Sequence, residues 1–277
     1  MANTRRKSNT AVATAASVRA LPPPPIREHF FNSWEDFKSG FSTALFGSGP
    51  FQRGRYLFRG HSDPSWKLTT TFDRMFASQP KGRRVAIADS LLKGFRQALE
   101  GFPVPPEALA SDSMMLALGQ HYGLPTRLLD WTESPYIASF FAYNRRTIWG
   151  VGDSQVVIWA LNVQHPIWSI QYGVELVDVP SFGNQRIRNQ AGKFTLARTP
   201  FATLEEYVAA HEEDGTALVR FLLPAQEATK ALADLDAMGI HHGVVYPEIE
   251  GSAQMALFRT VMQYGAHIQT QVSARPI

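Results

Sequence analysis

Side chains that can carry out chemistry are concentrated in one polar stretch of the sequence. It runs Gln120-His-Tyr-Gly-Leu-Pro-Thr-Arg-Leu-Leu-Asp-Trp-Thr-Glu-Ser-Pro135. The stretch offers an imidazole that titrates near neutral pH, a guanidinium that can hold anions and a carboxylate that can stabilise positive charge. An earlier segment reads Tyr56-Leu-Phe-Arg-Gly-His61, and the apolar run at its start ends at a further arginine, Arg59. A purely structural loop has little need of such a set, so the two segments together predict a functional site.

The segments around these residues have the periodicity of helices. Ser33 and Asp36 form a variant capping box ahead of apolar residues at four-residue spacing, which predicts a helix. Ser134 followed by Pro135 predicts the start of another helix directly after the polar stretch. Further helices are expected at 85–99, from Asp112 to Tyr122, at 225–238 and from residue 252, and a second capping box at 203–206 predicts one more.

Apolar runs predict the strands, at 56–59, 155–161, 193–197, 217–223, 244–246 and 267–272. The run 155–161 is apolar on both faces, which is typical of a central strand. Residues 162–183 carry few regular signals and read as a long loop. Helices and strands alternate without a regular βαβ period. The sequence therefore predicts an α+β or irregular α/β fold, with helices packed around one central mixed β-sheet.

The net charge of +3 is unevenly distributed along the chain. Residues 1–27 carry five Lys or Arg and no acidic residue, so the remainder has 22 Lys and Arg against 24 Asp and Glu. We expect 1–27 to form a disordered, basic, proline-rich tail and 28–277 to form a single domain. A duplex-binding domain would be basic over its folded part, so attraction to nucleic acid is expected to be weak and to come mainly from the tail.

The composition also limits where the protein can be expected in the cell and which metal sites it can form. The chain has no cysteine, which excludes disulfides and thiolate zinc sites and fits a cytoplasmic setting. No apolar run reaches the roughly 18–20 residues that span a bilayer, so no membrane association is expected. The N-terminus lacks a secretory signal, although its acid-free composition also resembles a transit peptide. The adjacent His241 and His242 would point apart on a strand, so no metal site is expected.

Four motifs resemble those of one known family. Phe58-Arg59-Gly60, the stretch 120–135, Arg188-Asn-Gln-Ala-Gly-Lys-Phe194 and Tyr246-Pro-Glu-Ile-Glu-Gly251 are similar, in this order, to the elements of the FRG domain. That domain is named for its Phe/Tyr-Arg-Gly motif and occurs widely in bacterial and phage proteins. The resemblance covers residues 30 to 260 and implies more about the fold than about an activity.

A weaker resemblance is to the mono-ADP-ribosyltransferases. Arg59 would hold the position at the end of their first strand. Asp130-Trp-Thr132, leading into Ala138-Ser-Phe-Phe-Ala142, would hold the second, and Gln190 would open a later strand. The resemblance implies an ADP-ribosyltransferase-like fold, NAD as the substrate and a nucleotide or a macromolecule as the acceptor. The family's catalytic glutamate is absent at the position of Gln190, which bears directly on transferase activity.

Such a site has a physical logic of its own. Cleavage of the nicotinamide–ribose bond of NAD passes through an oxocarbenium-like state, in which positioning and electrostatics matter more than a strong base. Arg59 would hold a diphosphate or a ribose, and Gly60 would let the ligand approach the backbone. Asp130 or Gln190 would hydrogen-bond a ribose hydroxyl, and His121 would handle protons. The remaining candidates are ligand contacts: Tyr122 or Trp131 for ring stacking, and Thr126, Arg127 and Thr132.

Each of these residues also has a structural alternative. Instead of binding a ligand, Arg59 and Asp130 would form a buried ion pair. Alternatively, Arg127 would be the partner of Asp130. Trp131 would belong to the core, and Thr132 would serve as a turn hydroxyl. His121 would cap helix carbonyls, and Gln190 would be structural.

Three classes of function follow from these alternatives. The first is a nucleotide-using enzyme, such as a bacterial or phage toxin or a defence effector. The second is a binding module for a nucleotide or a nucleic-acid end. The third is an interaction domain in which the signature residues are structural.

Overall fold

The computed structural model describes residues 26–144, 154–179, 188–212 and 214–272. The strands in these ranges form one mixed sheet of seven strands, in the order β1-β7-β4-β2-β3-β6-β5. Their bounds are β1 (Arg27–Phe30), β2 (Tyr56–His61), β3 (Leu128–Thr132), β4 (Gln155–Asn162), β5 (Val174–Val177), β6 (Gly192–Ala197) and β7 (Leu218–Pro224). Only β1 and β7 pair in parallel, and the other neighbours are antiparallel. The predicted α+β class with one mixed sheet is confirmed.

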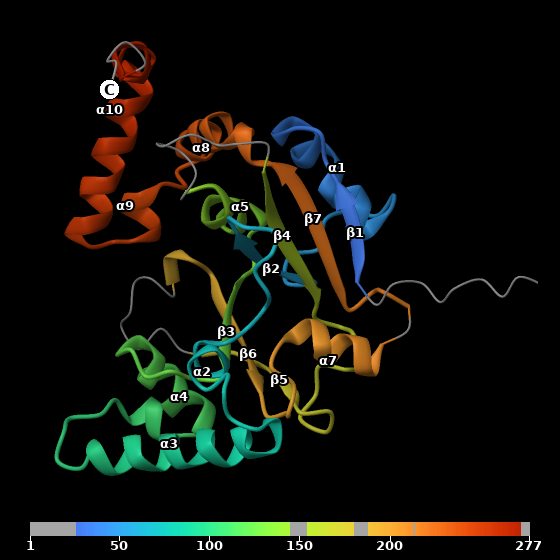
Figure 1. Cartoon of the computed structure of the whole chain (residues 1–277), viewed down its shortest axis with the longest axis vertical. Coiled ribbons are helices and arrows are strands. Elements are labelled where there is room, and N and C mark those ends of the chain that lie inside the picture. Colours follow the sequence, from blue (N-terminus) through green and yellow to red (C-terminus); the bar gives the residue numbers. More distant parts are fainter. Residues whose placement is uncertain (1–25, 145–153, 180–187, 213, 273–277) are drawn as a thin grey trace, which may run out of the picture.

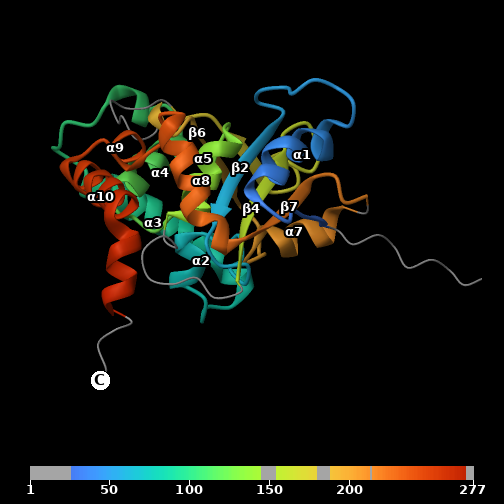
Figure 2. The same ribbon diagram turned by 90° about the horizontal axis from the view of Figure 1, so that it is seen from above.

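Helices pack around this sheet (Figure 1). They are α1 (Trp34–Phe46), α2 (Thr71–Met75), α3 (Arg84–Ala98), α4 (Asp112–His121), α5 (Pro135–Tyr143), α7 (Leu204–His211), α8 (Ala228–Ala237), α9 (His242–Val245) and α10 (Ile249–Val272). Short 3-10 turns lie at Lys81–Arg83, Pro106–Leu109 and Ala225–Glu227. In both views α9 and α10 lie on one side of the molecule, and β1, α1 and α7 lie on the other (Figure 1 and Figure 2).

Strand β4 separates two apolar cores, as its pattern predicts. Side chains alternate between the faces of a strand, and β4 is buried on both. Val156, Ile158 and Ala160 pack with α1, α5 and α8, whereas Val157, Trp159 and Leu161 pack with α7 on the opposite face. A third cluster joins α3 and α4 to β3 and β6. These cores fix β2 and β3, the strands that carry the candidate site.

The predicted helix starts are largely confirmed at atomic detail. The Ser33, Ser134 and Thr203 hydroxyls accept hydrogen bonds from the backbone N–H three residues on, as N-caps should. The cap of α4 is Ser111, whose hydroxyl accepts the N–H of Met114, and the expected start at Asp112 is the first helical residue. Either residue can cap, and the one in extended backbone does so.

Three expectations about elements are wrong. Residues 244–246 lie in and after helix α9, and 267–272 belong to the continuous helix α10. The expected loop 162–183 contains strand β5. Short β-branched runs have weak preferences that the tertiary context overrides. A Cβ at Gly251 would lie 1.9 Å from the Tyr246 carbonyl oxygen, so close packing of α9 on α10 is possible only with glycine there.

The expected N-terminal tail lies mostly outside the described residues. Residues 1–25 are outside them, whereas Arg27, the last residue assigned to the tail, opens β1 and pairs with Val219 of β7.

Candidate functional site

The sheet parts between β2 and β3, and the candidate site lies in the gap. The two strands are in register at one pair only, Phe58 with Thr132. An antiparallel ladder continued from this pair would join Arg59 to Trp131 and Gly60 to Asp130, but no such pairs form. Strand β2 instead stays paired along its whole length with β4, and β3 stays paired with β6. The gap thus exposes the end of β2 to the middle of β3.

Arg59 bridges this gap with its side chain. Its Nη1 donates to the backbone oxygen of Asp130 at 2.6 Å and lies 3.7 Å from the carboxylate Oδ2 of the same residue. Asp130 is 61% exposed and Arg59 24% exposed, so the pair is open to solvent rather than sealed in a dry interior. Gln120 of α4 orients the carboxylate, because its Nε2 donates to Asp130 Oδ1 at 2.6 Å.

A buried histidine lies behind the arginine. Arg59 Nε donates to His61 Nε2 at 3.2 Å, and the indole N–H of Trp159 approaches His61 Nδ1 at 3.4 Å. Burial, followed by the positive charge of Arg59, lowers the pKa of His61 to about 3. The ring is therefore neutral at physiological pH, and it orients Arg59 without competing for anions.

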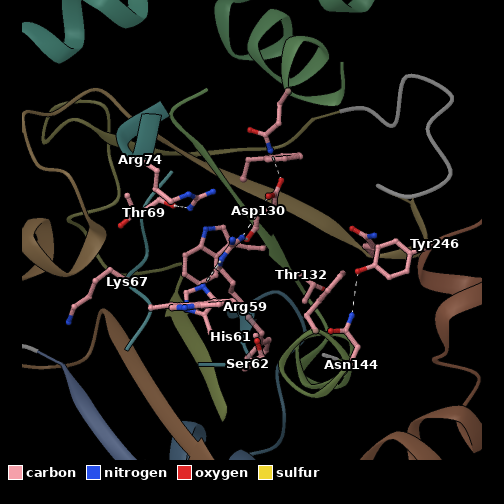
Figure 3. A pocket seen from close by; sticks show the side chains of 18 of the residues that line it. Arg59, His61, Ser62, Lys67, Thr69, Arg74, Asp130, Thr132, Asn144 and Tyr246 are labelled. Carbon is pink, nitrogen blue, oxygen red and sulfur yellow. Dashed lines mark hydrogen bonds and ion pairs between the residues drawn. The ribbon is translucent and has the colours of Figure 1, made fainter. Parts of the chain in front are cut away.

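The gap opens into a pocket of about 1000 Å³ (Figure 3). Among the predicted site residues, the pocket brings together Arg59, Gly60, His121, Asp130, Trp131, Thr132 and Gln190. It does not include Tyr122, Thr126 or Arg127. Arg59 and Asp130 therefore meet at an open pocket.

Gly60 is needed for packing rather than for close approach of a ligand. A Cβ at this position would lie 1.9 Å from the carbonyl oxygen of Ala138 and 2.6 Å from the N of Ala142. The backbone of α5 therefore rests directly on β2. The Arg-Gly pair thus has two roles, since the glycine seats the helix and the arginine reaches into the gap.

Arg127 has a structural role. It is buried, and its Nη2 lies 3.2 Å from Asp73 Oδ1. Its other guanidinium nitrogens donate to Asp73 Oδ2 and to the backbone oxygen of Thr199, and Arg84 completes the cluster at 3.8 Å from Asp73. The partner of Arg127 is therefore Asp73, and the idea that Arg127 pairs with Asp130 is wrong.

Three further candidates hold the polar stretch in place. The buried Thr126 hydroxyl donates to Gln120 Oε1 at 2.5 Å and accepts the N–H of Leu128. The Thr132 hydroxyl accepts the N–H of Ser134, which is the turn role considered from the sequence. Trp131 is 3% exposed and donates to the Thr195 hydroxyl within the core on the far face of β3, so it is not a stacking platform.

The last candidates lie around the opening. His121, the last residue of α4, lines the pocket and contacts the ring of Tyr122, which is itself 75% exposed and outside the lining. Gln190 lines the pocket from the turn before β6, where its Nε2 donates to the backbone oxygen of Val245 at 2.9 Å. The neighbouring Ala191 has a φ of 46°, a left-handed backbone that places Gln190 at the rim.

Comparison with known proteins identifies part of the chain. Residues 54–148 match the family model of the FRG domain. The chain contains an FRG domain. The matched residues include β2, α4, β3 and α5, and thus both sides of the gap. The full chain matches no curated protein and no solved structure, and the resemblance to mono-ADP-ribosyltransferases stays a hypothesis.

Sequence reasoning missed a second wall of the pocket, most of it within the FRG domain. Ser65-Trp66-Lys67, Thr69 and Arg74 line one end, and Asn144 and Tyr246 line the other. One signal was present in the sequence. After the Asp63-Pro64 turn, an aromatic residue and a lysine, Trp66 and Lys67, stand next to each other in the sequence.

A candidate metal cluster lies outside the pocket. Atoms of His165, Glu212 and Asp214 lie within 4.8 Å of one another. The N–H of Ile167 donates to Nδ1 of His165 at 3.5 Å, and Nε2 lies 3.7 Å from Glu212 and 3.9 Å from Asp214. None of the described helices combines the length and the apolar character needed to cross a membrane.

Proposed function

We propose that this FRG-domain protein binds a nucleotide in the pocket, and that NAD is the substrate whose nicotinamide–ribose bond is broken. ADP-ribose would pass to water or to a macromolecular acceptor, an activity that would suit a toxin or defence effector of the bacterial cytoplasm. One observation carries the proposal. Arg59 and Asp130 meet across the gap between β2 and β3 and remain open to a pocket of about 1000 Å³.

The charge of the lining supports an anionic ligand. The described lining residues include three basic side chains, Arg59, Lys67 and Arg74, and a single carboxylate, Asp130. A guanidinium presents a planar donor fork that matches phosphate oxygens. The volume is at the upper end of the roughly 300–1,000 Å³ usual for ligand pockets, which suits a dinucleotide.

Asp130 is the group that would act on the reacting bond. As the C–N bond breaks, its electron pair leaves with nicotinamide, and positive charge develops on the ribose. A fixed, partly exposed carboxylate beside that charge stabilises the transition state. A nucleophile then adds to the ribose carbon and releases a proton to solvent. Gln120 holds the Asp130 carboxylate in place.

Binding without turnover is the second candidate, and one observation favours it. The third position of the transferase pattern is an amide, Gln190, whose Nε2 is already held by the Val245 carbonyl. A neutral side chain offers less stabilisation of positive charge than a glutamate. A protein with this site could therefore sense a nucleotide without cleaving it.

The test is to incubate the full chain with NAD and to follow two signals. Calorimetry measures binding, and mass spectrometry measures released nicotinamide and any ADP-ribosylated product. Arg59→Ala is expected to lower the affinity for NAD at least about tenfold, because it removes a charged contact of roughly 1.5–3 kcal/mol. Asp130→Asn is expected to abolish nicotinamide release while keeping most of the binding.

Arg83→Ala removes an exposed arginine outside the pocket and serves as the matched control. Binding without nicotinamide release would favour the second candidate. If the wild-type chain neither binds nor cleaves NAD, or if Arg59→Ala behaves like Arg83→Ala, the proposal fails.

A further inference from the structure

The two ends of the pocket differ in charge, as Figure 3 shows. Lys67, Thr69 and Arg74 lie at one end, whereas Asn144 and Tyr246 lie at the other. Arg59 and Asp130 lie between them. A ligand that carries negative charge in one part is therefore held in a preferred direction.

The positive charge at the end with Lys67 and Arg74 is only partly balanced by the described residues of the pocket lining. Arg74 donates to the backbone oxygen of Thr69 at 2.5 Å, and Asp130 is the only carboxylate among the described lining residues. The charge of Lys67 acts on the Glu205 carboxylate of α7. Burial, opposed by the charge of Asp130 and reinforced by that of Arg74, lowers the pKa of Arg59. The two guanidiniums thus repel each other, and a diphosphate between them would relieve that repulsion.

The residue before Lys67 in the sequence, Trp66, adds an exposed aromatic ring to the pocket lining. Trp66 is 46% exposed and stands edge-on to His61, with ring centroids 6.1 Å apart. Its backbone is fixed from both sides, since its N–H donates to the Asp63 oxygen and the following Leu68 is hydrogen-bonded to α7. A fixed, half-exposed indole is a stacking surface for a planar base.

At the opposite end, the described lining residues are uncharged and mostly aromatic. The rings of Phe141 and Tyr246 are 6.1 Å apart at 83°, and Asn144 Nδ2 approaches the Tyr246 hydroxyl at 3.5 Å. The nicotinamide ring of NAD carries positive charge. It is therefore favoured beside aromatic faces and disfavoured beside Arg74 and Lys67.

On the basis of the proposed function, we infer that the pocket takes a dinucleotide in one orientation. The adenine stacks on Trp66, the diphosphate lies between Arg59 and Arg74, and the nicotinamide end lies against Asn144, Phe141 and Tyr246. This assigns Trp66 and Asn144 to opposite halves of the ligand and places the bond to be broken next to Asp130 and Thr132.

Half-ligands test the assignment. Binding of ADP, nicotinamide mononucleotide and NAD is measured by calorimetry on the full chain. Trp66→Ala is expected to weaken ADP and NAD about tenfold and to leave nicotinamide mononucleotide unchanged, with Trp66→Phe restoring most of the loss. Asn144→Ala is expected to weaken nicotinamide mononucleotide and NAD and to leave ADP unchanged. Tyr122→Ala, which removes an exposed ring outside the pocket, is the matched control.

The outcomes separate the two proposals. If wild type binds none of the three ligands, the proposed function and the orientation fall together. If wild type binds NAD but Trp66→Ala weakens nicotinamide mononucleotide and spares ADP, the orientation is reversed and the inference is wrong while the function stands. Equal weakening of both half-ligands by Trp66→Ala also overturns the inference, because it shows a general loss of the site.

Discussion

At the scale of single residues, two arginines of the signature have different physical roles. Arg127 and Asp73 are both almost fully buried, and they form an ion pair with each other. Arg59 and Asp130 are both partly exposed to the pocket. Burial therefore distinguishes the arginine that supports the fold from the arginine that is available to a ligand.

The first prediction concerns these two arginines. Arg127→Ala is expected to lower the free energy of unfolding by about 3–5 kcal/mol, since it leaves the Asp73 carboxylate buried without its main partner. Arg59→Ala should cost about 1 kcal/mol or less, because its pair is open to water. Urea denaturation of both variants measures the difference. Equal losses would mean that Arg59 is a structural residue after all.

The second prediction concerns Gly60. Gly60→Ala places a methyl group within 1.9 Å of the Ala138 carbonyl oxygen, so α5 must move away from β2. We expect a loss of several kcal/mol in unfolding free energy, in the range of severe overpacking. Gly94→Ala in α3, where nothing lies within 4 Å of the added Cβ, is the control and should be neutral or stabilising. A Gly60→Ala variant as stable as the control would contradict the close packing.

At the scale of elements, the N-terminus of α7 holds the pocket wall in place. The Glu205 carboxylate accepts the N–H of Leu68 at 3.1 Å, and Leu204 donates its N–H to the oxygen of Leu68. These bonds fix the segment that carries Trp66 and Lys67. The wall is therefore positioned by a helix well separated from it in the sequence.

The third prediction tests this positioning. Glu205→Ala is expected to raise hydrogen exchange at the Leu68 amide and to weaken NAD binding, while the cooperative unfolding of the sheet persists. Glu206→Ala, at the neighbouring position with a surface pair to Lys81, is the control and should leave exchange at Leu68 unchanged. Unaltered exchange in Glu205→Ala would show that Leu68 is held by other contacts.

Local signals explain which elements could be predicted. The caps at Ser33, Ser134 and Thr203 act within four residues, so they are readable from the sequence alone. The gap between β2 and β3 is not, because it depends on pairings between distant strands. Arg59 and Asp130 were predictable as a pair. Trp66 was missed because its segment is fixed by hydrogen bonds between Leu68 and α7, which is distant in the sequence.

At the scale of the whole molecule, the two apolar cores on either side of β4 give the sheet its rigidity. The gap is tolerated because β2 and β3 each have a full partner on their other side, β4 and β6. The lost backbone pairings are partly replaced by the bond from Arg59 to the Asp130 oxygen. The site thus lies where facing backbone groups of β2 and β3 do not pair with each other, while the rest of the sheet is complete.

The last prediction concerns the pH dependence of global stability. Glu212 follows α7, is buried, and accepts the backbone N–H groups of Thr216 and Ala217 through Oε1. Burial raises the pKa of Glu212 to about 7 from an ordinary value of 4.5. Between pH 4.5 and pH 7, Glu212 therefore holds a proton in the folded state that it has mostly lost in the unfolded state. This group therefore adds stability that is fully present below pH 4.5 and is lost as the pH rises through 7.

Glu212→Gln removes this titration while keeping an oxygen for the two backbone N–H groups. Relative to wild type, the variant is expected to gain on the order of 2–3 kcal/mol in unfolding free energy between pH 5 and pH 8. Glu206→Gln is the control, because hydrogen bonding to the Ala202 N–H and to Lys81 lowers the pKa of Glu206 and its titration falls below this window. Urea denaturation at several pH values measures both differences. Parallel stability curves for wild type and Glu212→Gln from pH 5 to pH 8 would mean that the Glu212 carboxylate is not buried in charged form, and that the turn leading into β7 is open to water.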